Sequence, residues 1–232
     1  MNFKQTPYGF EFNDGKVLVF FGNKTCSIEK LNFNYPEFNI RQVHQKHTDK
    51  IIKSNDDSAA VLADAHWTQE KNVALLIKTA DCMPILIHQP ESHTIAAVHA
   101  GWRGVQNRIT PKTFEILSEI NGKNSVNNFS DVFIGPHISQ NSFEVQNDVK
   151  NFLLQQSGPV SNEGFSEALY VKNENGKIFV DLEKIVADQI SPFKVRMIKS
   201  TNLDTKTNPD FHSFRRDGPH SGRNLSFICL LT

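Results

Sequence analysis

The sequence predicts a single α/β domain, built on a mixed sheet, over residues 1–232. Its apolar runs are short and rich in β-branched residues, which is typical of strands buried on one or both faces. Longer stretches with helical character lie between these runs. No repeat, low-complexity tract or Pro/Ser-rich linker divides the chain, and 232 residues are enough to enclose one large core.

Seven apolar runs predict the strands. They are too short for buried helices, and we expect them to form one sheet. In chain order they cover residues 17–21, 73–77, 85–87, 94–98, 132–134, 194–198 and 226–230.

Three stretches between the strands predict helices: residues 103–120, 145–155 and 181–189. The first should be interrupted near Pro111, and Asp181 is placed to cap the third. The polar segment 156–177 contains three glycines and is interpreted as an exposed connection. The strands predicted after it are expected to complete the same sheet, so it does not mark a domain boundary.

Charge and hydropathy exclude two classes of partner. Lys+Arg and Asp+Glu both number 25, so the chain lacks the basic surplus of a nucleic-acid-binding protein. The longest apolar runs, 73–77 and 227–231, are far too short to cross a bilayer. The first five residues carry no apolar signal core, and three sparse cysteines do not form a disulfide scaffold. We therefore expect a cytoplasmic protein without a membrane or nucleic-acid partner.

Three residues at the ends of apolar stretches are candidates for a metal site. His44 follows residues 38–43, Cys82 follows 73–77, and His99 follows 94–98. Two imidazoles and a thiolate form a ligand set that suits Zn²⁺. Spacings of 38 and 17 residues match no local zinc motif, so each residue could equally be structural. His47 could face the same way as His44 on a helical turn, or lie in solvent.

Four arginines are candidates for anion binding. Arg103 lies in the turn after His99, and Arg215, Arg216 and Arg223 lie near the C-terminus. Neighbouring arginines form either a solvated edge with salt bridges or a cradle for an anion such as phosphate. The sequence leaves both interpretations open.

Several segments, in this order, resemble the laccase-domain family, also called the multicopper polyphenol oxidase or purine nucleoside phosphorylase family. The resemblance covers residues 17–231. Its most specific segments are Thr79-Ala80-Asp81-Cys82-Met83-Pro84 and His99-Ala100-Gly101-Trp102-Arg103-Gly104. Gln42-Val43-His44-Gln45, Asp64-Ala65, Ile134-Gly135-Pro136-His137-Ile138, Phe143-Glu144-Val145 and Ser213-Phe214-Arg215-Arg216-Asp217 with Gly222-Arg223 support it.

The resemblance implies α/β/β/α layers and a zinc ion held by His44, Cys82 and His99. It also implies activity on purine nucleosides with phosphate as co-substrate. The implied reactions are phosphorolysis of adenosine, inosine, guanosine and methylthioadenosine to the free base and (methylthio)ribose 1-phosphate, and deamination of adenosine to inosine.

Two features of this chain depart from the family: one from its usual sequence pattern and one from its multicopper name. The family often has an arginine in an R-x-G-G-x-S turn after its first strand, whereas this chain has Phe21-Gly22-Asn23-Lys24-Thr25-Cys26-Ser27. Phosphate binding would then need Lys24 or another cation. Nine histidines without a His-x-His pair are also a poor ligand supply for a multicopper oxidase, so copper is less favoured than zinc.

Three functions follow as hypotheses. The first is a zinc-dependent purine nucleoside enzyme, in which the arginines hold phosphate and Asp81 either relays protons or orients a ligand. The second is a cysteine hydrolase or amidase with Cys82 as nucleophile and His99 or His44 as base, for which a peptidoglycan precursor is a candidate substrate. The third is a non-catalytic module that zinc stabilises.

Overall fold

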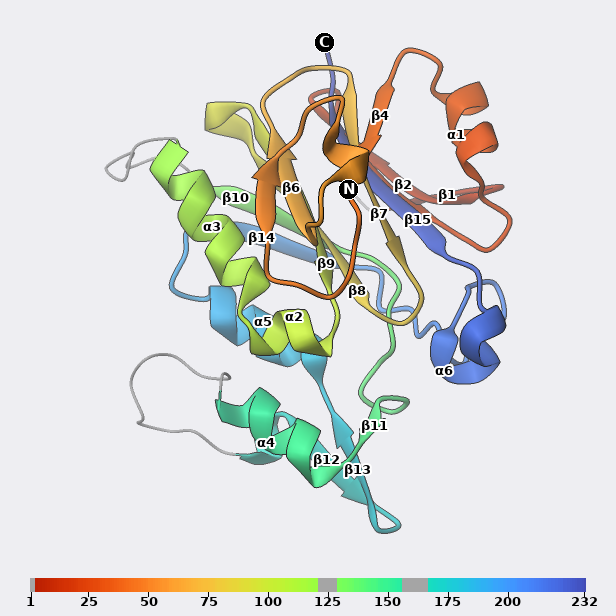
Figure 1. Ribbon diagram of the computed structural model, residues 1–232, viewed down its shortest axis with the longest axis vertical. Helices are drawn as coiled ribbons and strands as arrows, with labels where there is room; N and C mark the ends of the chain where they lie inside the picture. The colour runs from red at the N-terminus through yellow and green to blue at the C-terminus, as the bar shows by residue number, and fades with distance from the viewer. Residues whose placement is uncertain (1–2, 121–128, 156–166) are drawn as a thin grey trace.

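Two six-stranded sheets form the centre of the protein (Figure 1). The computed structural model describes residues 3–120, 129–155 and 167–232. The first sheet has the spatial order β1 (Lys4–Thr6), β2 (Gly9–Asn13), β3 (Val17–Gly22), β15 (Asn224–Leu230), β7 (Val73–Thr79) and β4 (Asn39–Gln42). The second has the order β14 (Val195–Ser200), β10 (Ser130–Ile134), β8 (Met83–Gln89), β9 (Thr94–Ala100), β6 (Ala65–Thr68) and β5 (Ile51–Lys53).

A small three-stranded sheet and six α-helices complete the described fold. The small sheet has the order β11 (Glu144–Val145), β13 (Lys177–Val180) and β12 (Val171–Glu174), and Figure 1 shows it beside α4 at the lower end of the molecule. The helices are α1 (Ile28–Asn34), α2 (Trp102–Gln106), α3 (Ile109–Ile120), α4 (Asn147–Gln155), α5 (Leu182–Ile190) and α6 (Phe214–Asp217). None of the helices in the described ranges has the length and apolarity needed to cross a membrane.

The two sheets pack face to face, with helices on both outer sides. In β3, Val17, Val19 and Phe21 pack into the core between the sheets. Their neighbours Leu18 and Phe20 point to the opposite face, because successive strand residues alternate. That outer face packs against α1, whereas α3 and α5 cover the outer face of the second sheet. The order of layers is therefore α/β/β/α, as the resemblance implied, and it explains why β3 is apolar on both faces.

All seven predicted strands are present, as β3, β7, β8, β9, β10, β14 and β15. The expectation that they share one sheet is wrong, since three of them lie in the first sheet and four in the second. Burial on both faces gives an apolar run without alternation, and such a run carries no information about its partner strand.

The helices differ from prediction in detail. The break in the stretch 103–120 falls at Asn107 and Arg108, where Arg108 has a φ of +58°, and not at Pro111. Pro111 lies in the first turn of α3, where no backbone N–H is needed for helical hydrogen bonding. The predicted cap of α5 is confirmed, because the Asp181 carboxylate accepts a hydrogen bond of 2.9 Å from the backbone N–H of Lys184.

The described part of the segment 156–177, residues 167–177, contains secondary structure and is not a plain connection. Residues 156–166 lie outside the described ranges, but β12 and the start of β13 form a hairpin in the remainder. Three of the four β12 residues, Lys172, Asn173 and Glu174, are exposed. The strand therefore lacks the apolar side chains that identify a strand in a sequence.

His66 on β6 lies in the core. It pairs with Ala97, which packs between the sheets, so the imidazole is fully buried. This burial lowers the pKa of His66 to about 3.

Because His66 stays neutral in the folded state but gains a proton when unfolded below about pH 6.5, we expect it to destabilise the protein as the pH falls. His66→Leu should reduce the slope of unfolding free energy between pH 6.5 and 4.5 by up to about 1.4 kcal/mol per pH unit. Urea denaturation at several pH values measures this slope, with His93→Asn, in an exposed turn, as control. Parallel slopes for wild type and His66→Leu would refute the expectation.

Candidate active site

Three chain segments bring a His/Cys/His group together. His47 lies in the loop after β4, Cys82 in the turn between β7 and β8, and His99 near the end of β9. Their ligand atoms all lie within 4.8 Å of one another. Among the described residues, no other group of three or more His, Cys, Asp or Glu side chains has a geometry that could hold a metal ion.

The group fits a tetrahedral metal ion. Cys82 Sγ lies 3.7 Å from His47 Nε2. Bonds of about 2.3 Å to sulfur and about 2.0 Å to nitrogen at a tetrahedral angle separate two ligand atoms by about 3.5 Å. His99 Nδ1 lies 2.7 Å from a carboxylate oxygen of Asp64, which leaves Nε2 as the ligand atom of His99. Three protein ligands with access to a cavity are the pattern of a catalytic rather than a structural zinc site.

The structure places His47, and not His44, in this group. His44 is exposed and lines the same cavity, but its imidazole is not among the clustered ligand atoms. The side chain of Gln45 forms two hydrogen bonds of 2.9 Å with the backbone of Lys78, which fixes the chain just before His47. Residues 42–47 read Gln-Val-His-Gln-Lys-His, two successive Gln-x-His triplets, so the sequence held both candidates and no local signal to separate them.

Cys82 and His99 form a charged pair in the absence of metal. Burial raises the pKa of the Cys82 thiol, but the neighbouring charge of His99 and contact with His47 outweigh it and lower this pKa to about 6. Burial alone would lower the pKa of His99, whereas the Cys82 thiolate and the Asp64 carboxylate raise it. A thiolate at neutral pH is the form that both binds metal and acts as a nucleophile.

Gly101 lies directly against the cluster. A Cβ atom at this position would come within 2.8 Å of Cys82 Sγ and 3.0 Å of His47 Cδ2. The backbone at Gly101 has ordinary dihedral angles (φ −74°, ψ 170°), so space and not conformation excludes a side chain.

We therefore expect Gly101→Ala to displace Cys82 or His47 and to weaken zinc binding by about 10-fold or more, as for other changes that misplace ligands. Competition with a zinc chelator measures this effect. Gly15→Ala, at a turn where a Cβ meets nothing within 4 Å, is the control for a loss of stability alone, because its φ of +85° strains any side chain. Unchanged zinc affinity in Gly101→Ala would contradict this prediction, because it would show that the cluster accommodates the added methyl group without losing its metal-binding geometry.

A cavity of about 740 Å³ opens beside the cluster. Its described lining includes four cations and a single carboxylate, that of Asp81. The cations are Lys78, Arg103, Arg215 and Arg223. The apolar part of the wall includes Trp102, Ile138, Phe143, Leu182 and Phe214. The cavity can therefore accommodate a ligand with an anionic group and a flat apolar ring.

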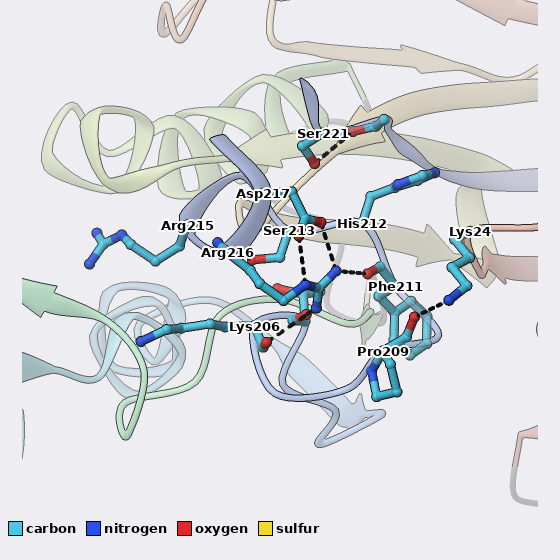
Figure 2. Close-up of polar contacts among 12 residues, drawn as sticks. Lys24, Lys206, Pro209, Phe211, His212, Ser213, Arg215, Arg216, Asp217 and Ser221 are labelled. Carbon is cyan, nitrogen blue, oxygen red and sulfur yellow. Dashed lines mark hydrogen bonds and ion pairs between the residues drawn. The ribbon is translucent and has the colours of Figure 1, made fainter. Parts of the chain in front are cut away.

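The candidate arginines divide between the cavity and the fold. Arg103 stacks on Trp102, with its guanidinium carbon 4.4 Å from the ring centroid, and lines the cavity together with Arg215 and Arg223. Arg216 does not line it. Figure 2 shows the Arg216 guanidinium inside the neighbouring loop, where it binds the Asp217 carboxylate and donates to carbonyl oxygens including that of Phe211 at 2.7 Å. Arg216 thus holds this loop, and its donors are directed away from the cavity.

Lys24 lies away from the cavity, so the structure gives no support to it as the substitute for the arginine that the family often has after its first strand. Its ammonium group donates a hydrogen bond of 2.5 Å to the carbonyl of Pro209, as Figure 2 shows, and it does not line the cavity. Lys78, at the end of β7, is the additional cation that the structure places there.

Asp81 connects the turn that carries Cys82 to the C-terminal segment. One carboxylate oxygen accepts a hydrogen bond of 2.7 Å from the Thr205 hydroxyl, and the other accepts one of 2.6 Å from the backbone N–H of Arg215. Asp81 has a φ of +79°, and these two bonds oppose the strain of that conformation. The contacts favour an orienting role, although the residue also lines the cavity.

Comparison with known proteins agrees with the fold. A purine nucleoside phosphorylase of Clostridium acetobutylicum is 30% identical over 98% of this chain and 99% of its own length, and one of Aquifex aeolicus is 32% identical over 90% and 93%. The crystal structure of YlmD from Geobacillus stearothermophilus superposes with a TM-score of 0.85 at 21% identity, covering 99% of both chains. Residues 2–231 match the multi-copper polyphenol oxidoreductase laccase family. Since that match spans nearly the whole chain, this protein belongs to that family.

Proposed function

We propose that this protein is a zinc-dependent purine nucleoside enzyme. The observation that carries the proposal is the presence of the His47/Cys82/His99 cluster, four cations and an aromatic wall in one cavity. Its relatives at 30–32% identity over most of the chain are named purine nucleoside phosphorylases. The proposed reactions are phosphorolysis of adenosine, inosine, guanosine and methylthioadenosine, and deamination of adenosine to inosine.

The cations hold phosphate in this proposal. In phosphorolysis, a phosphate oxygen attacks the anomeric carbon of ribose as the bond to the purine nitrogen breaks, and the purine leaves with a proton. Arg103 and Arg215 offer guanidinium donors for phosphate, and Lys78 adds a point charge. Preorganised charge of this kind stabilises the transition state without further rearrangement.

The remaining groups of the cavity bind the purine and handle protons. Trp102 and Phe214 offer aromatic faces to a purine ring, and Phe214 is about half exposed (51%), so a bound base would cover it. His44 lines the cavity outside the cluster, so its imidazole can exchange a proton with a bound nucleoside. Zinc, when bound, supplies Lewis acidity at the cluster.

Zinc and a reducing compartment both suit this chain. The described residues, which include all nine histidines, contain one group of three clustered metal ligands, and imidazole with thiolate suits zinc. We propose zinc rather than copper, and thus not a polyphenol oxidase, although the family description names copper. All three cysteines are free, which agrees with the cytoplasmic location that we propose.

Product analysis by chromatography tests this function. Protein with a measured metal content is incubated with adenosine, with and without phosphate, beside Cys82→Ala. We expect phosphate-dependent adenine and phosphate-independent inosine, both lost in the variant. Absence of product from zinc-loaded wild type, with inosine, guanosine and methylthioadenosine also inert, would overturn the proposal.

The phosphate site has its own test. Arg103→Gln and Arg215→Gln should each raise the KM for phosphate about 10- to 100-fold, the range expected on loss of a charged hydrogen bond. Lys24→Gln is the matched control, because Lys24 is a cation on a nearby loop that does not line the cavity. If the KM for phosphate in both arginine variants equals that of wild type and of Lys24→Gln, these arginines do not bind phosphate.

A second candidate, a cysteine hydrolase or amidase, is supported by the arrangement of Cys82, His99 and Asp64. His99 lies between the thiol and a fully buried carboxylate, as in a Cys-His-Asp triad. Such an enzyme would act on amides, such as a peptidoglycan precursor, without metal. Stoichiometric zinc in protein purified without added metal would count against this candidate, whereas amide hydrolysis by metal-free protein would establish it.

A further inference from the structure

A single buried carboxylate contacts both histidines of the cluster. Asp64 has no exposed surface, and its Oδ1 lies 2.7 Å from His99 Nδ1. The same oxygen accepts a hydrogen bond of 3.0 Å from the backbone N–H of His47. Asp64 itself is not one of the clustered ligands, and it contacts the cluster through the His99 ring and the His47 backbone.

The second oxygen of Asp64 fixes the loop on either side of His47. Oδ2 accepts hydrogen bonds from the backbone N–H groups of Lys46 at 3.2 Å and Thr48 at 2.6 Å, and from the Thr48 hydroxyl at 2.7 Å. Three successive backbone donors therefore converge on one carboxylate. His47 has a φ of +59°, a backbone conformation that residues other than glycine adopt only at an energetic cost. The hydrogen bonds to Asp64 maintain this conformation.

Strand pairing places Asp64 between the two histidines. Asp64 immediately precedes β6, which pairs with β9, and its carbonyl accepts a hydrogen bond of 2.8 Å from the backbone N–H of His99. On its other side β6 pairs with β5, which follows the His47 loop, and the backbone N–H of Asp64 donates to Lys50 at 3.0 Å. The register of three neighbouring strands thus brings one carboxylate to two ligands that are 52 residues apart in the chain.

We propose that Asp64 is the positioning residue of the metal site and holds both histidine ligands in place before metal binds. It orients His99 through the ring nitrogen and His47 through the loop backbone. The inference rests on the metal-binding part of the proposed function and not on purine chemistry. A carboxylate that orients a histidine ligand usually accounts for about 10- to 100-fold in metal affinity.

Zinc affinity and amide exchange test this inference together. Asp64→Asn should weaken zinc binding, measured by chelator competition, by about 10- to 100-fold, because an amide cannot accept all of these hydrogen bonds. In metal-free protein, the same variant should lose the slow hydrogen exchange of the amides of Lys46, His47 and Thr48. Thr48→Val, which removes one bond and keeps the carboxylate, should show the same effects to a smaller extent and covers the case in which Asp64→Asn does not fold.

Asp131→Asn is the matched control. Asp131 is also a buried carboxylate (3% exposed), but it pairs with Arg196 on β14 and does not line the cavity. We expect it to lower stability and leave zinc affinity unchanged. Wild-type zinc affinity in folded Asp64→Asn, or an equal loss in Asp131→Asn, would overturn the inference while the proposed function stands. If wild type binds no zinc, the proposed function fails instead. In that case, unchanged amide exchange in Asp64→Asn and Thr48→Val would refute the claim that Asp64 fixes the His47 loop.

Discussion

His47→Ala is expected to weaken zinc binding by at least about 100-fold, whereas His44→Ala should change it by no more than about twofold. His47 supplies one of three clustered ligand atoms, and the loss of a ligand exceeds the roughly 10- to 100-fold effect of an outer partner. His44 lines the cavity outside the cluster, so its removal has the small effect of a surface substitution. Chelator competition on both variants, three positions apart in one loop, measures the difference.

The same pair of variants separates two roles in catalysis. With nucleoside substrates, His47→Ala should lose activity together with zinc. His44→Ala should keep its zinc and show a lower kcat if His44 transfers a proton in the cavity. If His44→Ala loses zinc and His47→Ala does not, then His44 is the metal ligand and His47 leaves the cluster when metal binds.

The alkylation of Cys82 in metal-free protein should titrate with a midpoint near pH 6 and move toward pH 9 in His99→Ala. Burial raises the pKa of Cys82, but the charge of His99 together with the contacts to His99 and His47 outweighs it and lowers this pKa to about 6. Above the midpoint the thiolate predominates and reacts, and below it the thiol is protonated and unreactive. Iodoacetamide labelling over pH 5–9, with the peptide identified by mass spectrometry, measures both midpoints.

The other two cysteines provide an internal control for this titration. Burial raises the pKa of Cys26 to about 11 and that of Cys229 to about 12, so neither should be labelled in folded protein over this range. A single midpoint near pH 9 for Cys82 in wild type would contradict the charged pair with His99. Zinc added before the reagent should protect Cys82, and the degree of protection at each pH reports how zinc competes with protons for the thiolate.

These two experiments also distinguish the metal enzyme from the hydrolase. Both candidates need a thiolate at Cys82, so its titration alone supports neither over the other. His47 contributes to a metal site but has no place in a Cys82–His99–Asp64 triad. An activity that survives His47→Ala without metal therefore favours hydrolysis, and one that falls with zinc content favours the nucleoside enzyme.

The amino-acid sequence by itself predicted seven of the fifteen described strands and two of the clustered ligands. Runs such as 73–77 and 94–98 predict strands because they are apolar throughout, contain β-branched residues and are too short for buried helices. Cys82 and His99 follow from the same evidence, since side chains at strand ends gather at one edge of a sheet. The pairing of these strands into two sheets was not predictable, because apolar side chains on both faces do not specify a partner strand.

The third ligand was decided by tertiary structure. His44 and His47 each end a Gln-x-His triplet, and local sequence gives no reason to prefer one. The choice depends on Gln45 bonding to Lys78, 33 residues away, and on Asp64 binding the loop from 17 residues away. Both contacts join segments that the paired strands bring together.

The sequence also could not show which of two adjacent arginines faces the cavity. Arg215 and Arg216 are neighbours on α6, yet one lines the cavity and the other binds the Phe211 carbonyl inside its own loop. Adjacent residues on a helix point about 100° apart, so a pair of arginines predicts positive charge but not which side chain reaches a ligand. The strand pattern thus predicted an α/β domain and the kind of site, whereas the family resemblance implied the layers. Long-range hydrogen bonds decided which side chains form the cluster and line the cavity.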